Sequence, residues 1–188
     1  MNRILGSVLC STLFLAGTAS AAMNYTYLEG AYVNSEVDVG PFDVDGDGVS
    51  IGGSFAVVDK AHLFGSYTTQ DFDFGVDIDV IRLGGGINLE LSNMLDFVAT
   101  AAYVDVSVDG GSDDDGYELT GGLRSQLTDQ FQLDGRIAYT DLGNGSDDTS
   151  LLIDARFFVV ESLAIAGGVE IGDDATTWKI GVRWELPR

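Results

Sequence analysis

Apolar and polar residues alternate one by one through most of this chain. The clearest example runs from Thr177 to Leu186, and its even positions are all apolar: Trp178, Ile180, Val182, Trp184 and Leu186. Successive side chains of a β-strand point to opposite faces, so the segment predicts a strand with one apolar and one polar face. A water-soluble protein would bury the apolar face. A transmembrane barrel turns that face to lipid and keeps the charges in its lumen.

The same alternation recurs about ten times, and no helical period separates the segments. The connections alternate between long and short. Long acidic loops are predicted at 37–47, 71–77, 109–116, 143–148 and 172–174, and short turns near 59–61, 92–93, 128–129 and 161–162. An even number of strands, with short turns at one end and long loops at the other, is typical of bacterial outer-membrane barrels.

The charged residues follow the same alternation. Two sets share the polar parity of their segments: the basic residues Arg82, Arg124, Arg136, Arg156, Lys179 and Arg183, and the acidic residues Glu29, Glu118, Asp134, Asp154, Glu170 and Glu185. Among the basic residues after the N-terminal segment, only Lys60 and Arg188 depart from it. Since a lipid-facing Arg or Lys costs roughly 2–4 kcal/mol at mid-bilayer, this parity favours a lumen over a water-exposed surface.

A water-soluble barrel or sandwich would also alternate, with the apolar face as its core. Two features argue against it. The polar faces are rich in Gly, Ala, Ser and Thr, which suit a crowded concave interior, and the apolar faces carry Tyr, Trp and Phe near strand ends, as interfacial girdles do. We therefore predict an all-β fold: a closed antiparallel up-and-down transmembrane β-barrel of about ten strands, of outer-membrane type.

Residues 1–21 have the pattern of a secretory signal peptide. Arg3 is followed by an apolar run to Ala16 and by the small-x-small site Ala19-Ser20-Ala21. The only cysteine, Cys10, lies inside this segment. The mature chain, predicted as one barrel domain over 22–188, would therefore hold no disulfide or thiolate site, which suits a protein of the bacterial envelope.

The composition restricts the partners. Nine Lys and Arg against 30 Asp and Glu give a formal net charge of −21, which argues against binding to nucleic acid. With 45% hydrophobic residues the chain is too apolar to be a disordered acidic segment. Charge and apolar surface must be segregated within one fold.

The inward charges allow two interpretations. The first is a structural network of salt bridges that fills the lumen, because an isolated buried charge costs several kcal/mol. The second is a charged constriction that selects ions in a small pore, with inward glycines leaving room for water.

Asp43, Asp45 and Asp47, followed by Gly48, match the start of an EF-hand calcium loop, but Ser54 stands where the bidentate glutamate is expected. Weak calcium binding and a simple acidic turn are both consistent with this. The other loop acids predict an anionic rim, which either keeps the protein soluble or binds lipopolysaccharide through divalent cations. No catalytic residues are predicted, because His62 is the only histidine and has no Ser or acidic partner near it in sequence.

Short motifs carry a resemblance to a known group. Tyr25-x-Tyr27-Leu28-Glu29-Gly30-x-Tyr32, Ile81-Arg82-Leu83-Gly84-Gly85-Gly86 and Gly122-Leu123-Arg124-Ser125 resemble small bacterial outer-membrane β-barrel proteins. The chain is most similar to the short outer-membrane proteins of xanthomonads once proposed as quorum-signal or immunity-elicitor precursors, and more distantly to OmpA and OmpX type barrels. The resemblance implies an outer-membrane location and no established catalytic residues. One departure is the C-terminus, where Pro187-Arg188 follow the aromatic position at which such barrels usually end.

From these observations we expect a non-enzymatic protein of the bacterial outer membrane with a structural or surface-interaction role. The alternatives are a small ion or solute channel with a charged lumen, and a secreted signalling or adhesion module. The expected partners are outer-membrane lipid, lipopolysaccharide and, during biogenesis, the barrel-assembly machinery. We expect a monomer without cofactors, apart from the weak calcium site.

Overall fold

The structure is a computed structural model that describes residues 23–39, 42–73, 75–111, 113–143 and 147–187. The predicted signal peptide, residues 1–21, lies outside the described residues. Within the described part of the chain, none of the elements is a helix of the length and apolarity that membrane crossing requires.

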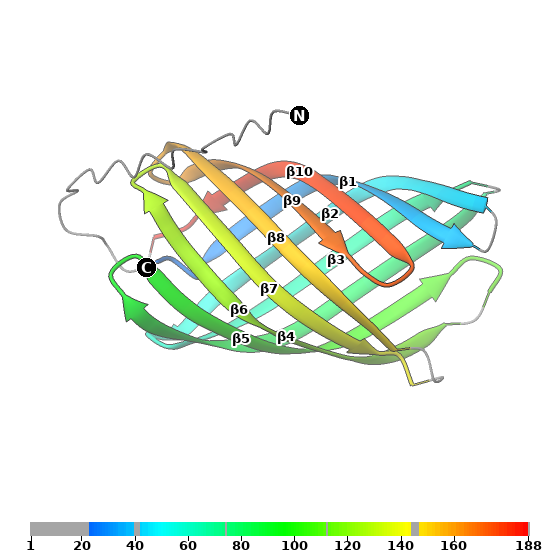
Figure 1. The fold of residues 1–188 in the computed structure, drawn as a ribbon, viewed down its shortest axis with the longest axis horizontal. Helices are drawn as coiled ribbons and strands as arrows, with labels where there is room; N and C mark the ends of the chain where they lie inside the picture. Colours follow the sequence, from blue (N-terminus) through cyan, green and yellow to red (C-terminus); the bar gives the residue numbers. More distant parts are fainter. Residues whose placement is uncertain (1–22, 40–41, 74, 112, 144–146, 188) are drawn as a thin grey trace, which may run out of the picture.

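Ten antiparallel strands form one closed barrel in which each strand pairs with its neighbours in sequence and β1 pairs with β10 (Figure 1). The strands are β1 (Tyr27–Val39), β2 (Phe42–Val58), β3 (Ala61–Phe72), β4 (Val76–Ser92), β5 (Leu95–Val108), β6 (Asp114–Thr128), β7 (Phe131–Asp141), β8 (Asp147–Val160), β9 (Leu163–Ile171) and β10 (Ala175–Glu185). The predicted up-and-down barrel of about ten strands is confirmed.

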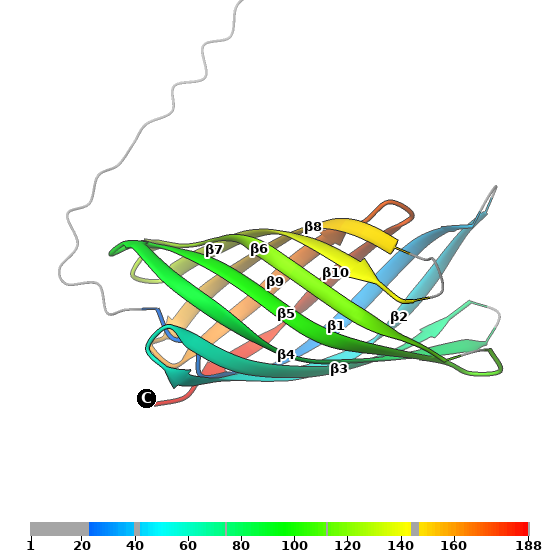
Figure 2. The same ribbon diagram turned by 90° about the horizontal axis from the view of Figure 1, so that it is seen from below.

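The two ends of the barrel differ, as the alternation of turns and loops predicted. One end, called here the turn end, holds both termini of the barrel and the tight turns at 59–60, 93–94, 129–130 and 161–162. Each tight turn is accompanied by a register shift in the strand pair it joins, such as that between Ala56 and Val58. Such bulges increase the local twist of the strands. The opposite end, called the hairpin end, carries the other five connections (Figure 2).

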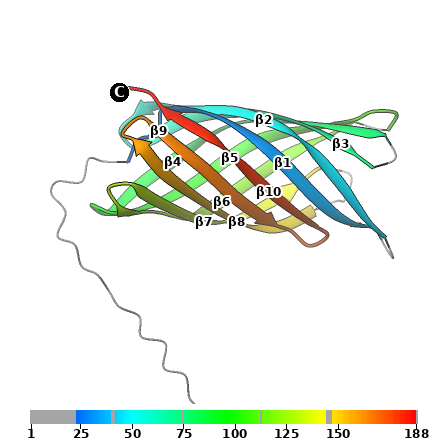
Figure 3. The ribbon, with the colours of Figure 1, turned by 90° about the horizontal axis from the view of Figure 1, so that it is seen from above.

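The first predicted long loop is mostly strand, which corrects its sequence-based boundaries, whereas 172–174 connects β9 to β10 as predicted. Residues 37–47 were expected to form a loop, but β1 and β2 continue until only 40–41 separate them, with Val37 paired to Val44 and Asp38 to Asp43. The Asp and Gly content of this stretch suggested a loop and hid its two-residue period. The strands β9 and β10 are shorter than β1 and β2, so their hairpin ends nearer the turn end (Figure 3).

Over most of the barrel the apolar side chains point outward. Exposed fractions reach 65% at Ile51, 58% at Leu83 and 62% at Ile180. A ring of exposed aromatic residues bounds this apolar belt toward the hairpin end: Tyr32, Tyr67, Tyr103, Tyr117, Tyr139 and Trp178. Toward the turn end, exposed Phe55, Phe157 and Trp184 edge the belt on β2, β8 and β10. The outward face is thus apolar as the alternation predicted.

Beyond the ring of tyrosines the polarity of the wall changes. The strand segments on that side, among them 34–39, 42–48, 76–80 and 104–108, are called here the crown. On β2, Asp43, Asp45 and Asp47 continue the outward face of Val49 and Ile51. Valines and isoleucines take the inward positions on several strands: Val33 and Val37 on β1, Val44 on β2, Val76, Ile78 and Val80 on β4, and Val104, Val106 and Val108 on β5. Val33 and Val104 are buried where the belt meets the crown, and the others are partly exposed. The crown is thus acidic outside and largely apolar inside on these strands.

Candidate functional site

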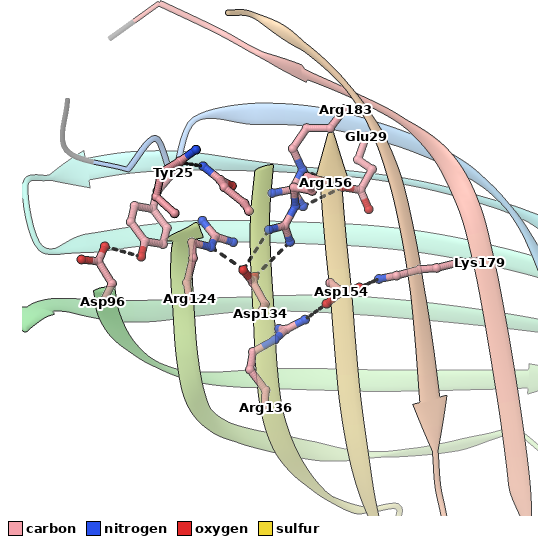
Figure 4. Close-up of polar contacts among 12 residues, drawn as sticks. Tyr25, Glu29, Asp96, Arg124, Asp134, Arg136, Asp154, Arg156, Lys179 and Arg183 are labelled. Carbon is pink, nitrogen blue, oxygen red and sulfur yellow. Dashed lines mark hydrogen bonds and ion pairs between the residues drawn. The ribbon is translucent and has the colours of Figure 1, made fainter. Parts of the chain in front are cut away.

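The lumen of the belt holds a set of ion pairs that joins almost all of the predicted inward charges. The pairs are Arg82–Glu118 at 3.1 Å, Arg124–Asp134 at 3.1 Å, Arg156–Asp134 at 3.0 Å, Arg136–Asp154 at 2.6 Å, Lys179–Asp154 at 2.7 Å and Arg183–Glu29 at 2.6 Å. Figure 4 shows most of them converging in the lumen, toward the turn end. The side chains come from β1, β4, β6, β7, β8 and β10.

Two aspartates at the centre of the network lie directly opposite each other. Asp134 on β7 and Asp154 on β8 are cross-strand partners, an arrangement in which like charges repel. Each is held between two cations: Arg124 and Arg156 on Asp134, Arg136 and Lys179 on Asp154. Arg156 donates to both carboxylate oxygens of Asp134, a bidentate geometry that is among the strongest ion-pair arrangements.

The remaining predicted lumen residues lie on the same face. Glu170 on β9 accepts a hydrogen bond of 3.0 Å from the Ser150 hydroxyl. Glu185 is partly buried at the turn end of β10. All the predicted lumen charges thus lie on the inward faces of their strands, and their partners could not be identified from the sequence.

Inward glycines make room for these side chains. A Cβ on Gly168 would collide with Asp154 Oδ1 and lie 2.7 Å from Lys179 Cε, and one on Gly122 would lie 2.8 Å from Arg136 Cγ. The expectation that the inward glycines leave space for water needs correction at these positions. At Gly168 the space is taken by charged side chains of the two adjacent strands, and at Gly122 it is taken first by the backbone of β7, since a Cβ there would collide with the Gly135 carbonyl.

The turn end of the lumen is filled by residues that the sequence reasoning did not assign to the network. The Tyr25 hydroxyl donates to Asp96 Oδ2 at 2.7 Å, and its ring stacks on His62 with centroids 5.0 Å apart. The Arg124 guanidinium lies 4.6 Å from the centre of the same ring, a cation–π geometry. Tyr25 and His62 are 4% and 6% exposed.

The chain just before β1 thus enters the mouth of the barrel. Met23 packs with Tyr25 and Val98, and Asn24 donates to the Leu186 carbonyl at 2.9 Å. Asp96 could have been found from the sequence, because the inward parity of Val98 and Thr100 extends to it. The role of Tyr25 had no such signal, since it precedes the first strand.

Above this packed layer the lumen contains a cavity of about 280 Å³. Charged residues Glu29, Arg82, Glu118, Arg136, Glu170 and Lys179 line it, together with apolar Val33, Val80 and Leu152 and the hydroxyls of Ser50, Ser66 and Thr68. A second cavity of about 70 Å³ lies toward Tyr25 and His62. Tyr27, Phe64, Glu118 and Arg136 line both cavities and so stand between them.

Asp43, Asp45 and Asp47 do not lie in a loop as the EF-hand comparison suggested. All three are in β2 and exposed, on one face of an extended strand. Alternate residues of a strand are about 6.6 Å apart, because the rise is about 3.3 Å per residue, so an EF-hand loop is not formed here. Among the described residues, no group of three or more His, Cys, Asp or Glu side chains is arranged to hold a metal ion. Weak calcium binding stays a prediction.

The outer wall of the crown carries a regular arrangement of tyrosines and carboxylates. Tyr67 donates to Asp79 at 2.9 Å, Tyr103 to Asp105 at 3.4 Å and Tyr117 to Asp141 at 3.3 Å. Asp71 on β3 lies opposite both Asp47 and Asp77 on the adjacent strands. A hydrogen bond and the negative charge of Asp71 raise the pKa of the exposed Asp77 carboxyl above its ordinary value.

Comparison with known proteins gives structural neighbours only. No family model matches the sequence, and no curated protein matches it. Solved structures similar to this one include a NanC porin (12% identity, 86% of this chain and 100% of that chain, TM-score 0.49) and the outer membrane protein OprG from Pseudomonas aeruginosa (10%, 89% and 99%, 0.47). The attachment invasion locus protein Ail of Yersinia pestis is another (13%, 87% and 100%, 0.41).

These neighbours are small outer-membrane barrels, and the likeness at such identities concerns the architecture alone. The similarity to the xanthomonad proteins is not confirmed by any of these comparisons.

Proposed function

We propose that this chain spans the bacterial outer membrane as a closed, non-enzymatic β-barrel whose crown is its interaction surface outside the cell. The observation that carries the proposal is the apolar belt with exposed aromatic residues at both edges and charges paired inside. On β2 the outward apolar positions run from Val49 to Val57. That length is close to the about 9–11 residues that a tilted transmembrane strand needs.

Water is a poor environment for such a surface. An exposed apolar belt around a whole barrel far exceeds the few hundred Å² that soluble monomers leave uncovered, whereas lipid covers it fully. Aromatic side chains at the two edges of the belt match the girdles of membrane barrels. The orientation follows from the connections, because short turns of such barrels face the periplasm, and the crown would then project from the cell surface.

The packed turn end of the lumen supports a barrel that does not conduct. The side chains of Arg124, Arg156 and Asp134 are only 8%, 3% and 2% exposed, and Tyr25 occupies the space beside them. An ion would have to break these pairs in order to pass. The alternative, a small channel, is favoured by one observation, the presence of two cavities separated by Glu118 and Arg136.

The acidic crown would be the surface that meets other molecules. Its carboxylates lie just beyond the tyrosine ring, at the level expected for the headgroups of lipopolysaccharide, and like charges such as Asp47, Asp71 and Asp77 face one another across strands. Divalent cations would relieve this repulsion and bridge the crown to the anionic headgroups. This bridging is tested by measuring how added calcium changes the thermal stability of unsubstituted protein and of Asp71→Asn in vesicles that contain lipopolysaccharide. An equal response of the two proteins would contradict bridging at Asp71.

Conductance across a planar bilayer tests the central proposal. Refolded mature protein, shown to be inserted by protease protection, is expected to give no steady current steps. Steady current steps in the unsubstituted protein, with an ion selectivity that changes in Arg136→Gln, would contradict the closed barrel and support the channel.

Cell fractionation distinguishes the closed barrel and the channel from the remaining alternative, a secreted module. We expect a monomer in the outer membrane, delivered by the barrel-assembly machinery and shifting in gel mobility on heating. Recovery from the culture medium as a soluble protein would instead support a secreted signalling or adhesion module.

A further inference from the structure

The inner wall of the crown carries a continuous apolar surface. It lies on three adjacent strands, β3, β4 and β5, and consists of Phe72, Val76, Ile78, Val80, Val106 and Val108. In the pairing of β4 with β5, Ile78 lies opposite Val108 and Val80 lies opposite Val106. All six side chains are partly exposed, so the neighbouring strands do not bury the surface.

This apolar surface faces a low part of the crown. In the order of the closed barrel, β9 is five strands from β4 and β10 is five strands from β5, which places the β9–β10 hairpin across the barrel axis from the surface. The strands β9 and β10 have 9 and 11 residues, against 17 and 14 in β4 and β5. The β3–β4 and β5–β6 hairpins extend further than the β9–β10 hairpin (Figure 2). The outer part of the surface is therefore open toward the exterior on the side of this short hairpin.

Water, and not lipid, meets this surface. It lies beyond the ring of tyrosines and inside the barrel, where no acyl chain covers it. An exposed apolar patch with a polar rim commonly marks a binding site, and concave walls that are mainly apolar are the usual form of small-molecule sites. The inner wall of the crown has both properties.

The charge of the crown restricts what can bind there. The sequence has no Lys, Arg or His within 34–48, 69–80, 104–116, 140–150 or 170–177, the segments that form the crown and its base. Among the described residues of these segments, the charged side chains on the inward faces are Asp114 on β6, Asp148 on β8 and Glu170 on β9. Since a concave site of one sign of charge concentrates counter-ions, the crown attracts cations and repels anions.

Asp114 places a carboxylate directly beside the apolar surface. It lies opposite Val106 in the pairing of β5 with β6, on the same inward face. A carboxylate has about four acceptor positions, so Asp114 can pair with a cation in addition to the interaction that it makes within the chain. An apolar wall and an anionic group thus adjoin each other.

We propose that the inner wall of the crown binds small apolar amines. The apolar body of the ligand packs against Ile78, Val80 and Val106, and its ammonium group pairs with Asp114. This inference deepens the proposed surface role and rests on it, because the crown meets dissolved ligands only if the belt lies in the membrane. It does not depend on whether the barrel conducts.

Three probes of similar length test the proposal: hexylamine is a cation, hexan-1-ol is neutral and hexanoate is an anion. The mature protein is refolded into nanodiscs of zwitterionic lipid and titrated by calorimetry, with empty nanodiscs as the reference for partition into lipid. Hexylamine is expected to bind about tenfold more tightly than hexan-1-ol, since a hydrogen bond to a charged group contributes about one such factor, and hexanoate should bind most weakly. Added salt should weaken the binding of hexylamine and leave that of hexan-1-ol unchanged.

Substitutions separate the apolar wall from the carboxylate. Val106→Asn is expected to weaken hexylamine and hexan-1-ol alike, whereas Asp114→Asn weakens hexylamine about tenfold and leaves hexan-1-ol unchanged. The control is Ser107→Asn, because Ser107 adjoins Val106 on the outward face of the same strand; it should alter neither affinity.

Insertion is measured first, by the heat-dependent gel shift and protease protection. Inserted protein that binds hexylamine no better than hexan-1-ol, or that responds equally to Val106→Asn and Ser107→Asn, overturns this inference and leaves the membrane barrel intact. A chain that does not insert overturns the proposed function, and this inference with it.

Discussion

The belt and the crown use the same alternation of side chains in opposite senses. In the belt, β4 directs Ile81 and Leu83 outward and Arg82 inward; in the crown, the same strand directs Asp77 and Asp79 outward and Ile78 and Val80 inward. The backbone pairing continues unchanged through both. The strand geometry therefore specifies only that successive side chains point to opposite faces. Whether the apolar or the polar side chains point outward depends on the medium that surrounds that part of the barrel.

Different interactions stabilise the interior of the belt and the interior of the crown. The lumen of the belt depends on ion pairs such as those at Asp134, whereas the crown interior is lined by partly exposed apolar side chains such as those of Ile78 and Val106. Ion pairs in a lumen satisfy one another only if every partner is present. The two zones should thus differ sharply in their response to substitution.

The largest effect is expected from Asp134→Asn. It removes the anion between Arg124 and Arg156 and leaves two buried cations unbalanced, which typically costs about 3–5 kcal/mol. The free energy of unfolding in urea, measured in lipid vesicles, checks this. Asp45→Asn on the crown is the matched control, expected to change stability by no more than about 0.5 kcal/mol. Similar small losses for both would mean that the lumen network is not structural.

The second prediction compares the same substitution, to arginine, at two positions on the outward face of β2. Ile51→Arg places a cation in the middle of the belt and should cost roughly 2–4 kcal/mol. Asp45→Arg lies on the same face of the same strand but in the crown, where water solvates the charge. If both variants unfold at the same urea concentration in vesicles, the belt is not the lipid-facing surface.

A smaller effect should distinguish inward from outward glycines. Gly168→Ala would force the Asp154–Lys179 pair apart, and overpacking of this kind costs about 1–3 kcal/mol. Gly135→Ala is the control, because a Cβ at Gly135 meets nothing within 4 Å. Thermal unfolding followed by circular dichroism measures both, and an equal stability of the two variants would contradict the tight packing at Gly168.

The smallest effect concerns the crown and has a defined dependence on pH. The pKa of Asp77 is raised by Asp71, so the folded protein holds this proton more tightly than the unfolded chain. The stability contributed by that proton is present below about pH 3.9, the ordinary pKa of aspartate, and is lost as pH rises through the raised pKa. Asp71→Asn should therefore raise the melting temperature slightly at pH 7 and leave it unchanged in acid. A destabilisation at pH 7 would contradict the repulsion between the two groups.

Much of this structure could be predicted from the sequence, for a clear physical reason. The two-residue period fixes the face of every strand residue, so the strand number, the outward belt and the inward position of Arg136 or Asp154 followed directly. The hairpins of the crown did not, because runs such as Asp43 to Gly48 have the composition of a loop although they alternate.

The ion-pair partners within the lumen also could not be predicted from the sequence. Which carboxylate meets Arg82 depends on the stagger between strands and on how far each side chain reaches across the barrel. Gly168 illustrates the difficulty, since its significance lies in the space it leaves for Lys179. Tyr25 precedes the first strand, so no periodic pattern indicated that it would enter the lumen.

The pairing of β1 with β10 has a kinetic consequence. All other strand pairs join neighbours in sequence, whereas across this seam the ion pair of Glu29 with Arg183 links residues 154 positions apart. Bringing such distant segments together requires a large loss of chain entropy before any contact forms, so closure of the seam should be the slow step of folding. Formation of the Glu29–Arg183 contact would then mark the moment at which an open sheet becomes a sealed barrel.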